Sequence, residues 1–344
     1  MKTFRKKADL GFSLIELMVA MGILSVLMLM LTVLLDQVQE SWTRSESRIS
    51  QFREARVAFD LMTKNISQAS LNTYWDLEDE DEDGLVDRYF RTSELHFATM
   101  DASALGSAGT QTPVGQAVFF QAPLGFSSTY RNLNNLFNGR GYFVTFGGDE
   151  NFRPSFVDAE QRYRFRLMEF RPPAEANQVF EDGAEERSNG EAQIFTEWFK
   201  QGLSVGEGSF EFHLNPLAEN IVTLVVSPRD SLTTGSGGGR NETYSTIAPD
   251  YKYDSNEPLS GAETFSQQVP PLVRVTMVAI DEASAVRLEN DSQMPDIIDD
   301  QLFRNTNRYE EDVQTLINSL NEQGINHKVF SSMVMLRSAK WSEY

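Results

Sequence analysis

One carboxylate stands alone in a long apolar segment. Glu16 is the only charged residue between Asp9 and Asp36. A charged side chain at the centre of a bilayer costs about 2.5–3.5 kcal/mol on insertion scales, so a carboxylate in a membrane-length segment is a candidate functional residue. A plain membrane anchor needs no such residue. Glu16 is therefore the first candidate for function.

A second group of carboxylates alternates along a polar segment. It consists of Asp79, Asp81, Asp83 and Asp87, and Gly84 directly follows the third of them. In calcium-binding loops, ligands come from positions one, three, five and nine, and a glycine at position six makes the sharp turn. The twelfth position, normally a bidentate Glu, is a phenylalanine here, which argues against a complete EF-hand. The pattern predicts a calcium site at the four Asp residues, with a solvated acidic loop as the alternative.

The remaining residues give no catalytic arrangement. His96, His213 and His327 are far apart and show no spacing typical of zinc ligands. The sequence has no nucleophile elbow, no Walker A loop and no dinucleotide-binding glycine motif after a strand. It also has no cysteine, which excludes thiolate chemistry and disulfides. We therefore expect that the protein is not an enzyme, and that calcium is the one cofactor to consider.

The charge of the chain limits its partners. The 30 basic and 50 acidic residues give a formal net charge of −20 over 344 residues. Such a surface repels phosphates, so no nucleic-acid partner is expected. The length is sufficient for one or two domains with a hydrophobic core.

The residues around Glu16 predict a membrane-spanning helix at 12–35. A helix needs roughly 20 apolar residues to cross a bilayer. Basic residues precede the segment and Asp36 and Glu40 follow it, so the positive-inside rule places the N-terminus in the cytoplasm and the bulk of the chain across the membrane. A secretory signal peptide fits poorly, because the apolar run is long and no small-x-small cleavage site follows it.

The helical pattern continues beyond this segment. No Pro or Gly interrupts residues 23–71, and the spacing predicts one helix from about Phe12 to about Leu71, roughly 90 Å long at 1.5 Å per residue. The amphipathic part, residues 36–72, is expected to pack on a sheet, with a free coiled coil as the alternative. Its apolar stripe consists of Val38, Trp42, Ile49, Phe52, Phe59, Met62, Ile66 and Ala69.

After residue 72 the pattern changes to strands. Runs of β-branched and aromatic residues predict antiparallel strands at 93–99, 116–121, 141–146, 163–170, 219–227, 273–281 and 328–337. Short helices are expected at 193–203, 282–288 and 308–322, the last with Asn307 and Glu310 spaced as a capping box. Long polar insertions lie at 174–191 and around 235–268. The sequence thus predicts an α+β fold with a long N-terminal helix packed on a β-rich part at 73–344.

The segment around Glu16 also resembles a known motif. Gly11-Phe12-Ser13-Leu14-Ile15-Glu16-Leu17 is similar to the cleavage and methylation motif of type IV prepilins and type II secretion pseudopilins. The resemblance implies that prepilin peptidase removes a basic leader, residues 1–11, by cutting after Gly11, and that Phe12 is then N-methylated. It implies that Glu16 helps to seat the subunit in a filament. The new amine of Phe12 can be neutralised by the Glu16 of a neighbouring subunit, and a paired buried charge is tolerated where a lone one is not.

Segments throughout the rest of the chain resemble the Verru_Chthon cassette protein C family, a prepilin-type family. They are Asn72–Asp76, Ser93–Phe97, Phe119–Gly125, Tyr163–Phe170, Leu272–Ala285 and Ala339–Ser342. This resemblance implies other cassette proteins, some of them pilin-like, as partners. A weaker likeness to minor pseudopilins of the J type rests on Pro271–Thr276.

Two functions remain open from the sequence. The first is a minor pilin or pseudopilin of the bacterial inner membrane, which assembles through Phe12–Leu35 with other pilin-like subunits at the tip of a type II secretion or type IV pilus-like filament. The second is a membrane-anchored binding module outside the cytoplasm, with or without calcium, that enters no filament.

Overall fold

The computed structural model describes residues 13–79, 84–106, 111–153, 156, 161–177, 179, 198–199, 213–230, 247–257, 266–289, 293–299 and 301–340. The chain forms two compact units, Met1–Gln51 and Phe52–Tyr344, and the second is called the head unit below. Helix α1, Leu14–Ile66, contributes residues to both. The predicted single long helix is confirmed, but it ends at Ile66 and not near Leu71, because turns follow at residues 67 and 68.

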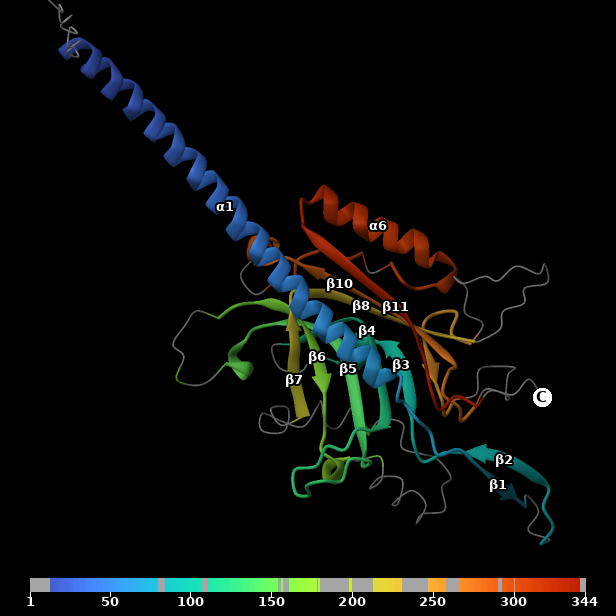
Figure 1. The fold of residues 1–344 in the computed structure, drawn as a ribbon. Coiled ribbons are helices and arrows are strands. Elements are labelled where there is room, and N and C mark those ends of the chain that lie inside the picture. The colour runs from blue at the N-terminus through green and yellow to red at the C-terminus, as the bar shows by residue number, and fades with distance from the viewer. Residues whose placement is uncertain are drawn as a thin grey trace, which may run out of the picture. The chain divides into compact units, whose positions relative to one another are not determined.

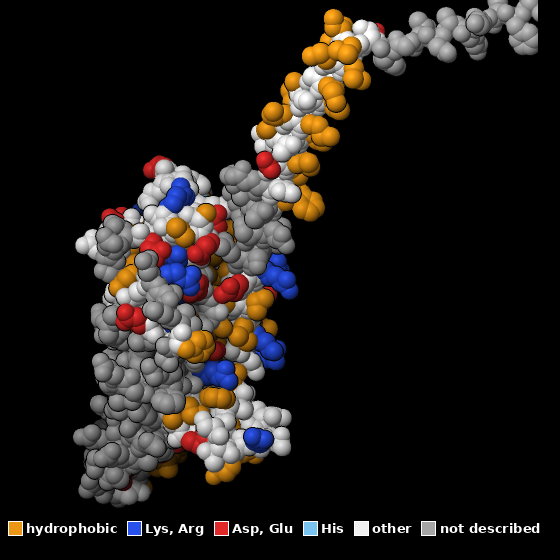
Figure 2. Space-filling model, turned by 90° about the vertical axis from the view of Figure 1, so that its left-hand side faces the viewer, with side chains coloured by type: hydrophobic (Ala, Val, Ile, Leu, Met, Phe, Trp, Pro, Cys, Tyr) orange, Lys and Arg blue, Asp and Glu red, His pale blue; other side chains and the backbone are white. Residues whose placement is uncertain are grey.

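The first part of α1 is apolar all round. Within the described residues, the segment Leu14–Gln39 is long and apolar enough to cross a membrane, and none of its most apolar window is buried. Figure 2 shows hydrophobic side chains along the visible side of this segment. A helix that is hydrophobic on every side requires a non-aqueous surrounding or other chains to cover it.

The head unit contains a six-stranded antiparallel sheet (Figure 1). Its strands, in spatial order, are β7 (Leu214–Glu219), β6 (Arg164–Phe170), β5 (Phe137–Gly147), β4 (Thr112–Pro123), β3 (Phe97–Asp101) and β9 (Tyr253–Asp254). A three-stranded antiparallel sheet consists of β11 (His327–Met335), β10 (Leu272–Ile280) and β8 (Ile221–Arg229). The predicted α+β fold, a long apolar N-terminal helix followed by antiparallel sheets, is confirmed.

One residue connects the two sheets. The sequence predicts a single strand at 219–227, but β7 ends at Glu219 in the larger sheet and β8 begins at Ile221 in the smaller one. Asn220, between them, has a φ of 61°. Asn adopts this left-handed region more readily than most residues do. A turn of one residue therefore carries the chain from one sheet to the other.

A hairpin was among the elements that the sequence pattern missed. β1 (Tyr74–Glu78) and β2 (Arg88–Thr92) pair as an antiparallel hairpin that forms a separate two-stranded sheet. Of the acidic segment, the described residues Asp79 and Asp87 lie outside the two strands, one after β1 and one before β2.

Short helices complete the head unit. The helix α5 (Glu282–Leu288) has the predicted bounds, and the Asp281 side chain caps it by accepting the N–H of Ser284. The helix α6 (Tyr309–Glu322) also exists, but the predicted capping box is wrong. A 3₁₀ turn, η5 (Thr306–Arg308), precedes α6, and Asn305 caps that turn by accepting the N–H of Asn307. Other 3₁₀ turns among the described residues are η1 (Ala102–Leu105), η2 (Glu150–Phe152) and η3 (Ala174–Ala176). The predicted helix at 193–203 lies almost wholly outside the described residues.

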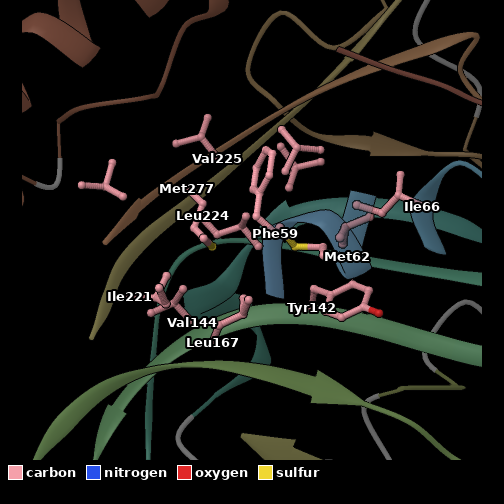
Figure 3. Close-up of a cluster of buried hydrophobic side chains, with 14 of the residues drawn as sticks. Phe59, Met62, Ile66, Tyr142, Val144, Leu167, Ile221, Leu224, Val225 and Met277 are labelled. Carbon is pink, nitrogen blue, oxygen red and sulfur yellow. The ribbon is translucent and has the colours of Figure 1, made fainter. Parts of the chain in front are cut away.

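The second part of α1 fills the space between the two larger sheets. Figure 3 shows Phe59, Met62 and Ile66 among side chains from both sheets. The neighbours labelled there are Tyr142 and Val144 of β5, Leu167 of β6, Ile221, Leu224 and Val225 of β8, and Met277 of β10, and all belong to one buried cluster. The predicted stripe is thus confirmed from Phe52, which packs against this cluster, to Ala69. Its first members differ, because Val38 and Trp42 are 54% and 77% exposed. The side chain of Ile49 lies outside the described part of the chain.

The other face of the six-stranded sheet is also covered. Phe119 of β4 stacks on Phe199 with ring centroids 3.9 Å apart, and Trp198 meets Phe119 edge-on at 6.3 Å. Gly141 of β5 makes this packing possible, since a Cβ there would lie 2.4 Å from the Phe119 ring. The central strands are therefore buried on both faces.

Candidate functional site

Glu16 lies in the first turn of α1. The helix begins at Leu14, and the Glu16 Oε2 atom accepts the backbone N–H of Ser13 at 3.0 Å. The N–H of Leu17 donates to the Ser13 carbonyl at 3.2 Å. A Ser followed three residues later by a Glu that reaches back to the Ser backbone is one half of a capping box. Glu16 therefore satisfies a backbone donor that the start of a helix otherwise leaves without a partner.

The electrostatics of this position favour an anion without neutralising it. The N-terminus of a helix carries a partial positive charge, which stabilises a nearby carboxylate by typically 0.3–1 kcal/mol at exposed positions. No ion pair joins Glu16 to a cation among the described residues. One N–H bond and a helix dipole stabilise the carboxylate, but neither is a cation. The site can therefore still accept a cation.

The residues of the predicted cleavage site are not described. Gly11 and Phe12 lie outside the described residues, which begin at Ser13. The predicted cut after Gly11 and the methylation of Phe12 thus stay predictions from the sequence.

The predicted calcium loop is described in part. Asp79 and Asp87 are exposed at the two ends of the loop between β1 and β2, whereas Asp81 and Asp83 lie outside the described residues. Gly84 has a φ of 83°, and its N–H donates to Asp79 Oδ2 at 2.8 Å. Among the residues that are described, no three His, Asp or Glu side chains are grouped as metal ligands. The calcium site therefore also stays a prediction.

His96 has a structural role in the head unit. It is buried, its Nε2 lies 2.7 Å from Asp254 Oδ1, and its Nδ1 accepts the indole N–H of Trp198 at 3.2 Å. Burial alone would raise the pKa of Asp254. The hydrogen bond from His96, with backbone donors from Asn256 and Glu257, outweighs it and lowers that pKa. His96 thus joins β3, β9 and the Trp198 segment.

The comparison with known families concerns this N-terminal region. A family model described as the prokaryotic N-terminal methylation motif matches residues 6–32. The chain carries a prepilin-type N-terminus. The match includes Gly11, Phe12 and Glu16, and it supports a type IV pilin or pseudopilin-type protein with a membrane anchor. No curated protein and no solved structure gives a significant match to the chain.

One feature of the site was missed from the sequence. Glu16 was identified from its charge in an apolar segment and from the motif, but its bond to Ser13 was not inferred. The signal was present, because Ser13 and Glu16 have the spacing of a capping box before an apolar run.

Proposed function

We propose that the protein is a minor pilin or pseudopilin subunit. Prepilin peptidase cleaves it after Gly11, Phe12 is N-methylated, and the subunit assembles through the apolar part of α1 with other pilin-like subunits. The observation that carries this proposal is the position of Glu16: a carboxylate in the first turn of an exposed apolar helix, within a matched methylation motif. A subunit of this kind acts by contact and assembly, not by catalysis.

Glu16 can form a hydrogen bond in the free subunit and an additional ion pair in the filament. In the free chain its Oε2 accepts the Ser13 N–H. A carboxylate has two oxygens and about four acceptor positions, so it can keep this bond and also accept the methylated amine of a neighbour's Phe12. The amine brings the positive charge that the backbone bond lacks. Because both charges are removed from water, an unpaired Glu16 or an unpaired amine is strongly unfavourable, which enforces one register between neighbours.

The apolar part of α1 provides the surface for this assembly. The side chains of residues 14–35 are exposed around the whole helix. The bilayer covers them before assembly, and neighbouring helices cover them in a filament. The positive-inside rule places the N-terminus in the cytoplasm and the head unit on the other side of the inner membrane. The bulk of the head unit favours the tip or the initiation complex of a type II secretion or type IV pilus-like machine, and the cassette resemblance favours cassette proteins as partners.

The alternative is a membrane-anchored binding module that enters no filament. The observation that favours it is the turn at Gly84, which closes on the Asp79 carboxylate as a calcium loop requires. A module of this kind would use α1 only as an anchor, so it would tolerate the loss of Glu16.

Substitutions of Glu16 distinguish the two functions. Glu16→Ala removes the charge and the bond to Ser13, whereas Glu16→Gln keeps an acceptor oxygen and removes only the charge. We expect both variants to insert into the membrane and both to lose co-assembly with partner pilins, measured by cross-linking between α1 segments. Asp36→Asn, at the other border of the apolar segment, is the control and should assemble normally. Normal assembly of Glu16→Gln would show that the charge pair is not used.

N-terminal sequencing of the membrane-extracted protein tests the processing step. The proposal expects a chain that begins with N-methylated Phe12. A chain that begins with Met1 would leave only a plain anchor.

A further inference from the structure

We propose that the head unit binds a ligand with an apolar body and a cationic end. The site is a cavity of about 590 Å³, the head cavity, lined by residues of β4, β8, the 250–252 segment and the 294–304 segment. Cavities of roughly 300–1,000 Å³ with apolar walls and a few polar groups are the usual sites for small ligands. This inference is independent of the proposed function and would hold for either a filament subunit or an anchored module.

A bulge in β4 forms one wall of the cavity. The pairing of β4 with β5 shifts register between Val114 and Val118. Gly115, inside the bulge, has a φ of 72°, and a Cβ there would lie 2.9 Å from Thr223 Oγ1. Glycine is therefore required where β4 packs against Thr223 and Leu224 of β8. Bulges of this kind often lie next to functional sites, because they redirect a strand locally.

Gln116 holds three walls together. Its side chain is buried, its Oε1 accepts the N–H of Val226 in β8 at 2.7 Å, and its Nε2 donates to the Phe303 carbonyl at 3.4 Å. One side chain thus connects the bulge, the neighbouring strand and the 294–304 segment. The spacing of the walls is fixed by polar contacts as well as by packing, so the cavity is preformed.

Two aromatic residues of the cavity have a strained backbone. Tyr251 and Phe303 both line the cavity and have φ values of 66° and 57°. Both are buried, with exposed fractions of 1% and 8%. Bulky residues rarely adopt this region, because the Cβ atom crowds the backbone there. The strain is held by buried bonds: Thr99 Oγ1 donates to the Tyr251 carbonyl at 2.8 Å, and the Phe303 N–H donates to Asp312 Oδ2 at 2.9 Å. Such residues cluster at ligand sites.

The chemistry of the walls selects the ligand. Apolar side chains line the interior, among them Met100, Val114, Phe165 and Leu224. The charged residues of the lining are four Asp residues and two basic residues: Asp101, Asp250, Asp296, Asp299, Lys252 and Arg304. Arg304 pairs with Asp101 at 2.5 Å. The three other Asp residues are exposed and outnumber Lys252, so the rim attracts a cation.

Two sources could supply such a ligand. One is a free amine with an apolar body. The other is a peptide in which an apolar residue adjoins Lys or Arg. Both present an apolar group to the interior and a positive charge to the Asp residues of the rim.

Methyl NMR of the processed full-length protein in nanodiscs tests the proposal. Met100 and Met294 line the cavity, whereas Met333 and Met335 of β11 do not. With ¹³C-methyl Met, titration with 2-phenylethylamine should shift the Met100 and Met294 signals saturably, at least tenfold more tightly than 3-phenylpropanoate, with Met333 and Met335 unchanged. The blocked peptides Ala-Phe-Lys-Ala and Ala-Phe-Glu-Ala form a second matched pair. Tighter binding of the amine or of the Lys peptide identifies the source.

Variants make the test specific. Val114→Phe fills the cavity and should abolish the shifts, while unchanged Met333 and Met335 signals report that the fold is intact. The double variant Asp250→Asn and Asp299→Asn should lose most of the preference for the cation. Asp60→Asn, at an exposed position of α1 outside the cavity, is the matched control and should bind normally. The proposal is overturned if neither cationic probe binds, if the anions bind equally well, or if all four Met signals shift together.

Discussion

Residues 14–39 and 52–66 belong to one helix, yet they use apolar side chains in opposite ways. In the first range they are exposed all round, whereas in the second they form a stripe that is buried between two sheets. Polar residues differ in the same sense. Asn65 donates to the Tyr142 hydroxyl at 2.7 Å, and that hydroxyl donates to Glu169 at 2.8 Å, so its partners lie within the head unit. Within the part of the chain that the structure describes, the hydrogen-bond partner of Glu16 is a backbone N–H from its own turn.

The difference shows where each part obtains its stability. Residues 52–66 are stabilised within their own chain, because their apolar stripe is buried and Asn65 is hydrogen-bonded inside the head unit. Residues 14–39 are not stabilised in this way in an isolated chain. Their apolar surface requires a bilayer or neighbouring helices, and the Glu16 carboxylate requires a cation. This is the reason to look for assembly in the first range and for ligand binding in the head unit.

The largest expected effect comes from breaking the buried stripe. Phe59→Ala removes a ring that packs 5.8 Å from Phe330 and among both sheets, and large-to-small changes of this kind cost about 3–5 kcal/mol. Leu29→Ala, in the exposed part, is the matched control and should leave the unfolding of the head unit unchanged. Denaturant unfolding of the full chain, followed by Trp fluorescence, measures both. Equal effects would mean that the two ranges do not differ as described.

The sequence predicted the elements whose patterns are long and regular. The 3.6-residue spacing located α1, and runs of β-branched residues located the longer strands. The hairpin β1–β2 was missed because Trp75, Leu77 and Tyr89 are exposed, so no alternation of buried and exposed residues is visible. The two-residue strand β9 is too short for any pattern.

The site was predicted only as far as it is local. Glu16 is recognisable because its neighbours in the sequence are apolar. The head cavity could not be recognised in the sequence, because its walls come from β4, β8 and the 294–304 segment and depend on a bulge. Distances between such segments are set by tertiary packing, which no local pattern contains.

A smaller effect on the free energy of unfolding is expected at Asp254, and it depends on pH. The pKa of Asp254 is lowered in the folded state, so this residue stabilises the fold above the ordinary Asp pKa of about 3.9. That contribution is lost as the pH falls through the lowered value. Asp254→Asn should therefore reduce the free energy of unfolding by roughly 1.5–3 kcal/mol at pH 7, the usual size for hydrogen bonds to charged groups. The difference from the wild type should begin to shrink as the pH falls below about 3.9 and should vanish only below the lowered pKa.

Unfolding measured at several pH values between 7 and 3 checks this sign. Asp60→Asn is the control, because Asp60 is an exposed residue of α1 whose pair with Arg56 spans 3.9 Å. It should cost little at any pH, as exposed pairs do. A deficit of Asp254→Asn that persists unchanged at pH 3 would contradict the charged hydrogen bond to His96.

The smallest effect concerns the acidic loop. The carboxylates of this loop are Asp79, Asp81, Asp83 and Asp87. If they bind calcium, they resemble Glu16 in requiring a cation from outside the chain. We expect weak binding, with a dissociation constant of about 10⁻⁴–10⁻³ M, as in extracellular modules with few ligands. Calorimetry on the full chain in nanodiscs measures it, with magnesium as the comparison ion. Asp79→Asn should weaken binding most, because that carboxylate also closes the turn at Gly84, and no heat at millimolar calcium would leave a solvated acidic loop.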